Sequence, residues 1–225
     1  MSILSSCASL KGPSPVVQRA ATARQGVTET IALPVPQHKG QTSVEEALSK
    51  RRSVRDYKDE PLTLAEVSQL LWAAQGITNP AGFRTAPSAG ALYPLELYVV
   101  AGNVKDIAAG VYKYRVGAHE LAMVTPGDRR GELAAVALDQ SCIKEAAIDF
   151  VFAGVYERTT RKYGERGIRY VYMEVGHAAQ NVYLQAVSLG LGTVVVGAFE
   201  DDKIKKVVGM TDDERPLYIM SVGKR

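Results

Sequence analysis

The sequence predicts a single α+β domain built on a central sheet, and three observations support this. Two helices come first, followed by a mixture of strands and helices, which is typical of α+β domains. Short apolar runs at residues 95–100, 147–155 and 193–196 have the length and composition of buried strands. The 225 residues, 46% of them hydrophobic and 23% charged, suffice for one well-filled domain and are too few for two large ones.

Residues 1–41 are expected to form an extended or disordered arm that precedes the domain. They show no sustained hydrophobic periodicity, and they contain four prolines, Pro13, Pro15, Pro34 and Pro36. The folded domain is therefore expected over residues 42–225.

The first residues contain one short motif, Leu4 to Cys7, that resembles the lipobox of bacterial lipoproteins. A secretory signal needs a basic start and about 7–15 apolar residues before the cleavage site. Only Met1, Ser2 and Ile3 precede Leu4. We therefore expect a cytoplasmic protein, and anchoring through Cys7 would require a start site further upstream.

Two capping boxes predict the first two helices. Ser43 opens an S-x-x-E box, from which a short helix runs toward residue 52. Thr63 opens a second box of the same kind, and Gly76 is placed to end the helix that follows.

The other elements follow from hydrophobic period and turn residues. A loop rich in Gly, Pro, Ser and Ala occupies residues 79–90. The elements expected after it are strands at 95–100, 110–114 and 119–124, a helical region at 128–145, a strand at 147–155, a long helix at 168–189, a strand at 193–196, a short helix at 201–208 and a strand at 216–222.

Composition excludes several classes of function. The net charge of +3 is small, and basic residues alternate with acidic ones, so we expect no nucleic-acid partner. No apolar run approaches the roughly 20 residues of a membrane span. Cys7 and Cys142 lie too far apart to suggest a disulfide framework, and the three histidines lack ligand spacing, so no metal site is expected.

A basic cluster follows the first helix. Arg51, Arg52 and Arg55 surround Ser53, and a phosphate monoester is bound by this combination of charge-assisted donors and a hydroxyl. The alternative is that these cations cap the last carbonyls of the helix and interact with its dipole. The cluster alone leaves both interpretations open.

Gly190 and Gly192 do not form a dinucleotide-binding loop. Such a loop needs a strand before the glycines and a helix after them, together with a third glycine. Here the glycines follow a helix and precede a strand, and Val195 occupies the third position. They are better explained as the end of the long helix.

Taken together, several segments resemble the FMN-dependent nitroreductase superfamily, and most of all its SagB-type dehydrogenase branch. The resemblance covers residues 43–225, and its motifs occur in the family's order. They are RRSVRDY at 51–57, APSAGALYP at 86–94, KYGERG at 162–167, EVGHAAQN at 174–181, GLG at 190–192 with VGAF at 196–199, and VGKR at 222–225.

The resemblance implies a nitroreductase-like sandwich, with a mostly antiparallel sheet flanked by helices and two FMN sites in an intertwined homodimer. Carried over by position, the phosphate, ribityl chain and pyrimidine edge of the flavin would be held by Arg51, Arg52, Ser53 and Arg55. The segment that reaches the flavin of the other subunit would be Pro87, Ser88, Ala89 and Gly90. The ring would be contacted by Val196, Gly197 and Ala198, and further phosphate contacts would come from Lys224 and Arg225.

Lys162 and Tyr163 match in kind the Lys–Tyr pair that removes protons in the SagB-type branch, while the flavin takes hydride from a peptide azoline ring. A desolvated Lys or Tyr works as a general base. The alternative is that both side chains lie on a solvated helix end.

The function expected is FMN-dependent ping-pong hydride transfer. NAD(P)H or a substrate would reduce the flavin, and an organic acceptor such as a nitro or quinone compound would reoxidise it. Residues 91–95 replace the element expected of classical nitroreductases at that place, which puts nitroaromatic preference in doubt. The alternatives are a SagB-type azoline dehydrogenase acting on ribosomal peptides, with a cyclodehydratase partner, and a flavin-binding carrier or sensor without efficient turnover. A branch that cleaves its own bound reduced flavin is a further alternative.

Overall fold

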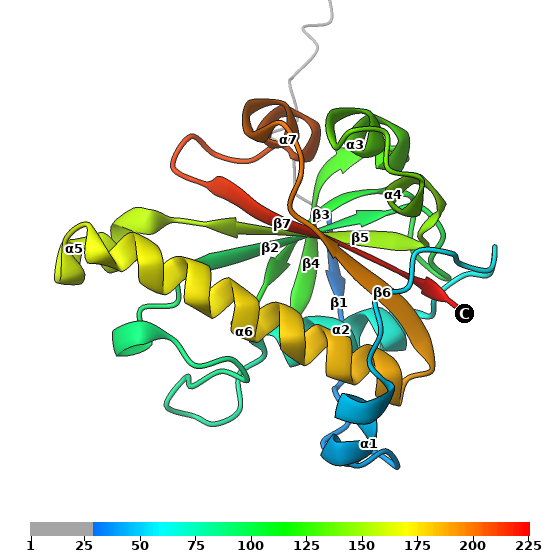
Figure 1. Ribbon diagram of the computed structural model, residues 1–225, viewed down its shortest axis with the longest axis horizontal. Helices are drawn as coiled ribbons and strands as arrows, with labels where there is room; N and C mark the ends of the chain where they lie inside the picture. Colours follow the sequence, from blue (N-terminus) through cyan, green and yellow to red (C-terminus); the bar gives the residue numbers. More distant parts are fainter. Residues whose placement is uncertain (1–28) are drawn as a thin grey trace, which may run out of the picture.

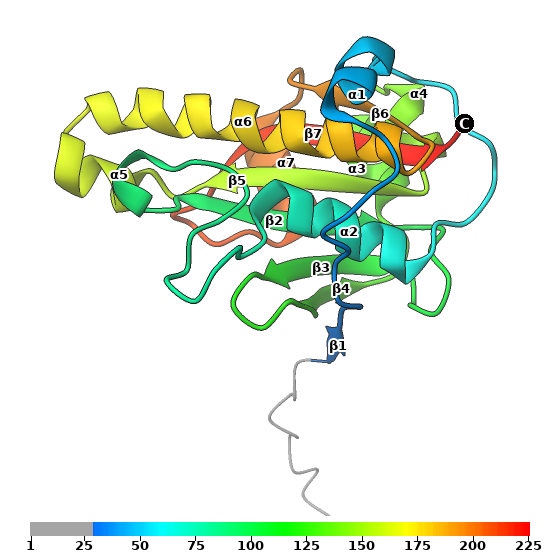
Figure 2. The same cartoon turned by 90° about the horizontal axis from the view of Figure 1, so that it is seen from below.

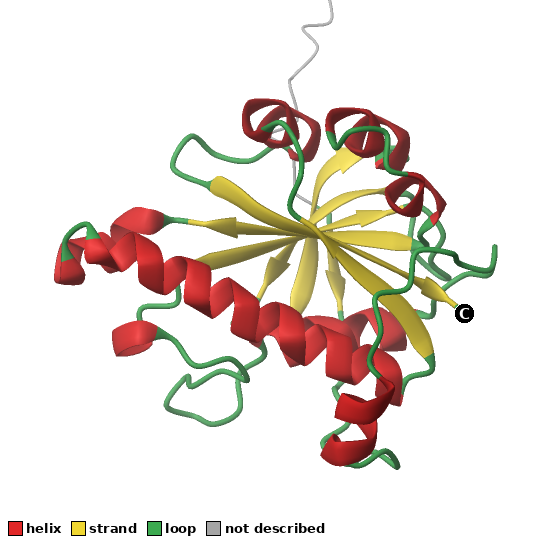
Figure 3. Ribbon diagram, viewed as in Figure 1, coloured by secondary structure: helices red, strands yellow, loops and turns green. Residues whose placement is uncertain are grey.

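The protein folds as one central sheet covered by helices on both faces (Figures 1 and 3). The computed structural model describes residues 29–225, so Cys7 and residues 1–28 of the expected arm lie outside the described part. The expected α+β class, with helices around an antiparallel sheet, is confirmed. No helix in residues 29–225 has both the length and the apolar character needed to cross a membrane.

Seven strands form the sheet in the order β1-β4-β3-β2-β5-β7-β6, and every neighbouring pair is antiparallel. The central strands β2 and β5 are buried almost throughout, as their continuous apolar sequences predict. The strands are β1 (Thr30–Ala32), β2 (Leu95–Ala101), β3 (Gly110–Arg115), β4 (Glu120–Pro126), β5 (Ile148–Gly154), β6 (Leu191–Val196) and β7 (Arg215–Lys224).

One face of the sheet is covered by α2 (Leu64–Gln75) and α6 (Arg166–Ser188), with α1 (Val44–Lys50) beside the C-terminal part of α6 (Figures 1 and 2). Both predicted capping boxes lie at helix starts. The Ser43 side chain accepts a hydrogen bond from the Glu46 amide, and Thr63 and Glu66 cap each other reciprocally.

The opposite face is covered by α3 (Arg130–Val136), α4 (Ser141–Glu145) and α7 (Asp201–Val208). Leu133, Ile143 and Ile204 pack on this face in a core separate from the one under α2 and α6. The helical region expected at 128–145 is thus divided into two short helices. The chain turns between them at Leu138 and Asp139, which both have positive φ.

Two elements were not expected from the sequence. Thr30–Ala32 form an edge strand on β4, so the described part of the arm is extended and lies on the domain. Residues 156–163 form helix α5, which is rich in charged residues and packs on the start of α6 through the buried Thr159. The edge strand depends on a partner about 90 residues further along the chain, whereas α5 depends on packing against the helix that follows it.

Candidate functional site

The basic cluster lies where α1 ends. Arg51 is the C-cap residue, and its guanidinium lies 5.2 Å from the centre of the Tyr183 ring on α6. Arg52 donates to the carbonyls of Ser49 and Arg51 at 3.0 and 2.7 Å. Arg52 and Arg55 are exposed, and within residues 29–225 no carboxylate pairs with any of the three arginines. The cluster therefore keeps its positive charge available for an external anion, although Arg52 also caps carbonyls as the alternative interpretation expected.

Tyr183 links this cluster to the sheet. Its hydroxyl lies 3.3 Å from Ser53 Oγ and accepts a hydrogen bond from the backbone amide of Val195 at 2.9 Å. The amide of Val54 donates to the Thr193 carbonyl of β6 at 3.0 Å. Tyr183 was not predicted from the sequence, although its hydroxyl lies among the apolar residues of α6 and is a signal in itself.

Two glycines make room for the segment that carries the cluster. A Cβ at Gly192 would lie 2.7 Å from Val54 Cγ1, and a Cβ at Gly223 would lie 2.7 Å from Tyr57 Cγ. Both distances are shorter than real carbon contacts, so any larger residue would displace the segment. A glycine at position 192 therefore allows residues 51–57 to pack closely on β6 and β7. It also follows the end of α6.

The C-terminal residues lie beside the same segment. The Lys224 carbonyl accepts a hydrogen bond from the Lys58 amide at 2.9 Å. The Lys224 ammonium forms an ion pair with Glu66 of α2 at 2.5 Å, and Arg225 is exposed at the chain end. A contact between Lys224 and the phosphate stays a prediction. In it, the Lys224 ammonium would interact with the Glu66 carboxylate and with the phosphate at the same time.

The segment predicted to run along the flavin ring begins at the end of β6. Val196 is buried in the sheet, while Gly197 and Ala198 are exposed directly after it. A Cβ at Gly197 would meet only the Tyr218 ring, at 3.8 Å or more, so the backbone there is open to solvent.

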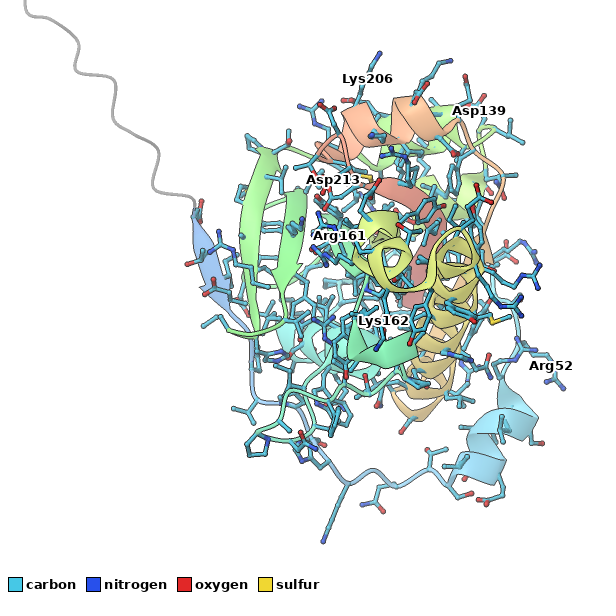
Figure 4. All side chains as sticks on the ribbon, turned by 90° about the vertical axis from the view of Figure 1, so that its left-hand side faces the viewer. Arg52, Asp139, Arg161, Lys162, Lys206 and Asp213 are labelled. Carbon is cyan, nitrogen blue, oxygen red and sulfur yellow. The ribbon has the colours of Figure 1, made fainter. Side chains whose placement is uncertain are left out.

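The predicted proton-transfer pair and the predicted proline–serine segment lie together. Gly90 belongs to the 3₁₀ turn η1 (Ala89–Ala91), and a Cβ at Gly90 would lie 2.7 Å from Tyr163 Oη and 3.0 Å from Lys162 Nζ. Figure 4 shows the Lys162 side chain over this turn. Gly90 has positive φ, which is ordinary for glycine, but Ala91 and Tyr93 also have positive φ, and such backbone strain is typical of functional segments.

A buried acid lies under the same segment. Glu174 of α6 is 2% exposed, and its Oε1 has no hydrogen-bond partner in the described residues. Burial raises the pKa of Glu174 to about 7, although the Ser88 hydroxyl and the Arg84 guanidinium oppose this rise. In the sequence Glu174 is recognisable only as part of the motif at 174–181, although an acid on the apolar face of a helix is itself a signal.

The two groups of predicted residues lie at opposite ends of α6 (Figure 1). Lys162 and Tyr163 precede its first turn, whereas Tyr183 holds the basic cluster near its last turns. Each helical residue advances about 1.5 Å, so the two groups are separated by roughly 25 Å along the helix. Figure 4 likewise shows Arg52 well away from Lys162.

A cleft of about 490 Å³ lies between residues 35–44, α2 and the end of α6. Trp72 forms part of its lining and stacks on His38 with ring centres 5.1 Å apart. None of the residues predicted to contact flavin lines this cleft. This cleft is therefore separate from the predicted flavin residues of the single chain.

Comparison with known proteins assigns the family. The sequence model described as "Nitroreductase family" matches residues 48–224, nearly the whole described chain. The chain belongs to the nitroreductase family. It is accordingly an oxidoreductase, and the resemblance stated from the motifs is confirmed.

The similarity of this nitroreductase-family chain extends to individual proteins. A Methanocaldococcus jannaschii protein provisionally named a nitroreductase is 52% identical over 182 residues, covering 81% of this chain and 91% of its own. The crystal structure of a Ralstonia eutropha protein, also provisionally named a nitroreductase, superposes with a TM-score of 0.76 at 28% identity, covering 88% of this chain and 91% of that one. The microcin B17-processing protein McbC of Escherichia coli is 28% identical over 171 residues, covering 72% of this chain and 62% of its own.

Proposed function

We propose that this member of the nitroreductase family is an FMN-dependent oxidoreductase that works as a homodimer. NAD(P)H or a substrate reduces the flavin, and an organic acceptor such as a nitro or quinone compound reoxidises it. The observation that carries the proposal is the cluster of Arg51, Arg52 and Arg55, which has no carboxylate partner in residues 29–225 and lies beside the Ser53 hydroxyl.

The donor set of this cluster fits the phosphate of FMN. A phosphate monoester carries close to two negative charges and is bound well by guanidinium groups and a hydroxyl acting together. Tyr183 holds Ser53 and supports Arg51, so part of the site is preorganised. Lys224 and Arg225, at the adjacent chain end, would add positive charge to the same site.

The separation of the two groups along α6 supports a site shared between two copies. The basic cluster of one copy would hold the phosphate and ribityl chain, and Pro87 to Gly90 of the other would face the ring. The outer face of α6 exposes Tyr172 and Met173, at 54% and 53%, and Gly176 has no atom near its Cβ position. An exposed apolar helix face of this kind is suited to packing against a second copy.

The residues around the ring would position the flavin and favour its reduced form. FMN, when bound, supplies the centre that accepts a hydride from the donor and passes it to the acceptor. Gly197 and Ala198 would let the ring approach the backbone closely. A cation from the cluster beside the pyrimidine edge would favour the reduced, anionic flavin.

A second candidate function is a SagB-type azoline dehydrogenase. The packing of Lys162 and Tyr163 against Gly90 favours it, because both groups then border the segment assigned to the flavin ring. In that position either side chain could remove a proton from a substrate. The similarity to a microcin-processing protein also favours a peptide as substrate. A cyclodehydratase partner would follow from the resemblance to the SagB-type branch.

The visible absorption spectrum of the purified protein, before and after anaerobic addition of NADPH, tests the proposal. We expect the bands of oxidised flavin and their bleaching by NADPH. Flavin bands that bleach only with an azoline peptide would favour the second function. Bands that no donor bleaches would indicate a carrier, and a protein that takes up no FMN would contradict the proposal.

A further inference from the structure

Tyr93, two residues after the 3₁₀ turn η1, has a strained backbone with a φ of +47°. A residue other than glycine keeps this conformation only when its surroundings hold it there. Two contacts come from its own segment: the Tyr93 amide donates to Ser88 Oγ at 2.9 Å, and the centre of the Tyr93 ring lies 4.3 Å from Arg84 Cζ. A third contact reaches Tyr93 from α5.

This third contact is made by Arg158, in the first turn of α5. Its Nη1 donates to the Tyr93 carbonyl at 3.1 Å, and its Nη2 forms an ion pair with Glu96 of β2. Because the guanidinium carries several donors in a fixed planar arrangement, one side chain bonds to both groups at once. Arg158 therefore ties α5 both to the end of the turn and to the sheet.

Glu96 is itself anchored, so its pair with Arg158 is not an isolated surface ion pair. Lys113 of β3 lies 3.2 Å from Glu96 and 2.5 Å from Glu214. Glu214 is buried, and it accepts a hydrogen bond from the Tyr98 hydroxyl at 2.6 Å. A single exposed pair contributes little, whereas several charges in a network hold one another in place. The sheet therefore fixes the position of the Arg158 guanidinium.

The face of α5 that carries Arg158 also carries Lys162, because the two residues are four positions apart. At the Lys162 end of the helix, a Cβ at Gly90 would lie 3.0 Å from Lys162 Nζ and 2.7 Å from Tyr163 Oη. At the other end, Arg158 holds the Tyr93 carbonyl. Helix α5 thus meets residues 88–93 at two points, and these two contacts set its orientation relative to that segment.

We propose that Arg158 is a positioning residue that holds residues 88–93 and the pair of Lys162 and Tyr163 in one fixed arrangement. This role rests on the proposed function, because residues 87–90 are assigned to the flavin ring of the second copy and the pair to proton transfer. Arg158 acts only through these groups. Its loss disturbs their arrangement and leaves the phosphate site intact, since the basic cluster lies at the other end of α6.

The test compares wild-type protein with Arg158→Ala. The Arg158 side chain is 41% exposed, so its removal opens no buried cavity and the variant should fold. The matched control is Arg161→Ala, which removes another exposed cation of the same helix. A further variant, Glu96→Gln, keeps Arg158 and removes the negative charge that anchors it.

The first readout is amide hydrogen exchange in flavin-free protein. The turn is reported by the Tyr93 amide and by the Ala91 amide, which donates to the Ser88 carbonyl at 3.0 Å. We expect both amides to exchange at least about tenfold faster in Arg158→Ala than in wild type or Arg161→Ala. The amides of β6, at the far edge of the sheet, should keep their wild-type rates. Unchanged rates at the turn, or an equal increase in β6, would overturn the inference.

The second readout is the same exchange in Glu96→Gln and in the variant that carries both substitutions. Glu96→Gln should speed exchange at the turn several-fold, because Arg158 loses its anchor. The double variant should be no faster than Arg158→Ala, because the charge of Glu96 reaches the turn only through Arg158. An increase equal to the product of the two single effects would overturn this link.

The third readout is steady-state kinetics of FMN-loaded protein with NADPH and a quinone. We expect Arg158→Ala to lower kcat about tenfold or more, since misplaced groups slow the chemistry, while the KM for NADPH and the bound FMN stay within about twofold of wild type. An unchanged kcat, or a loss of FMN that accounts for the loss of rate, would overturn the link to catalysis. The exchange experiments need no flavin, so a protein that passes them and takes up no FMN contradicts the proposed function alone.

Discussion

The hydroxyl of Tyr163 occupies the space that a side chain on Gly90 would need, because a Cβ there would lie 2.7 Å from Tyr163 Oη. This contact joins α5 to the 3₁₀ turn and sets the position of Lys162 as well. Two motifs that are more than 70 residues apart in the sequence therefore form one surface.

We predict that Gly90→Ala destabilises the fold more than Gly82→Ala in the same loop. Both glycines have positive φ, at +66° and +83°, so each substitution costs about 1 kcal/mol of backbone strain. Only Gly90 adds a close contact, with the ends of the Tyr163 and Lys162 side chains, and because these ends can shift the further cost is about 1 kcal/mol. Urea denaturation measures both losses, and equal losses would show that Tyr163 does not fill the space at Gly90.

Tyr183→Phe is expected to weaken both the fold and flavin binding. The Val195 amide loses its acceptor and Ser53 loses its hydroxyl neighbour. An unsatisfied, partly buried donor costs roughly 1–3 kcal/mol, and FMN affinity should fall about five- to tenfold. Denaturation and FMN titration measure the two effects. Wild-type stability and FMN affinity in Tyr183→Phe would contradict this role for Tyr183.

Lys162→Ala is expected to slow turnover about 10²- to 10⁴-fold without a change in bound flavin, as is usual for the loss of a general base. Arg161→Ala is the matched control, since Arg161 is the exposed neighbouring cation on α5 (Figure 4). Steady-state kinetics and flavin absorbance separate the two quantities. Equal rates for both variants would contradict a catalytic role for Lys162 and show that it is a solvated residue at a helix end.

Glu174 is expected to make stability fall as the pH rises. Its pKa is about 7 in the folded protein against an ordinary value of 4.5, so between these pH values the folded state binds more protons than the unfolded state. The free energy of unfolding of wild type should therefore decrease relative to Glu174→Gln by on the order of 3 kcal/mol from pH 4.5 to above pH 7. Urea denaturation at pH 5 and pH 8 measures this difference, and a constant difference would contradict the raised pKa.

Local signals in the sequence were sufficient for most of the fold. The boxes at Ser43 and Thr63 specified helix starts, because an N-cap bonds to residues only three positions away. The continuous apolar runs of β2 and β5 specified buried central strands. Helix α5 was missed because its only fully buried side chain is that of Thr159, and its stability comes from packing on α6.

Site residues could be predicted where they belong to one sequence motif. They could not be predicted where they depend on a partner far away in the sequence. Arg51 and Ser53 could be predicted together because they lie in one sequence motif, and the structure places both beside Tyr183, while their contact with flavin stays a prediction. Tyr183 and Glu174 were missed because their partners, Ser53 and Ser88, are 130 and 86 residues away. Both are polar residues on the apolar face of a helix. From the hydrophobic periodicity of the sequence alone, such residues are expected only to pack in the core.

The central claim is that the basic cluster holds the phosphate of FMN. Its most direct test is to titrate flavin-free protein with FMN and with riboflavin, which lacks only the phosphate. Two charge-assisted contacts at about 1.5–3 kcal/mol each predict at least a hundredfold tighter binding of FMN, and this difference should be lost in the variant carrying both Arg51→Ala and Arg55→Ala. Equal affinity of the wild-type protein for the two flavins would contradict the claim.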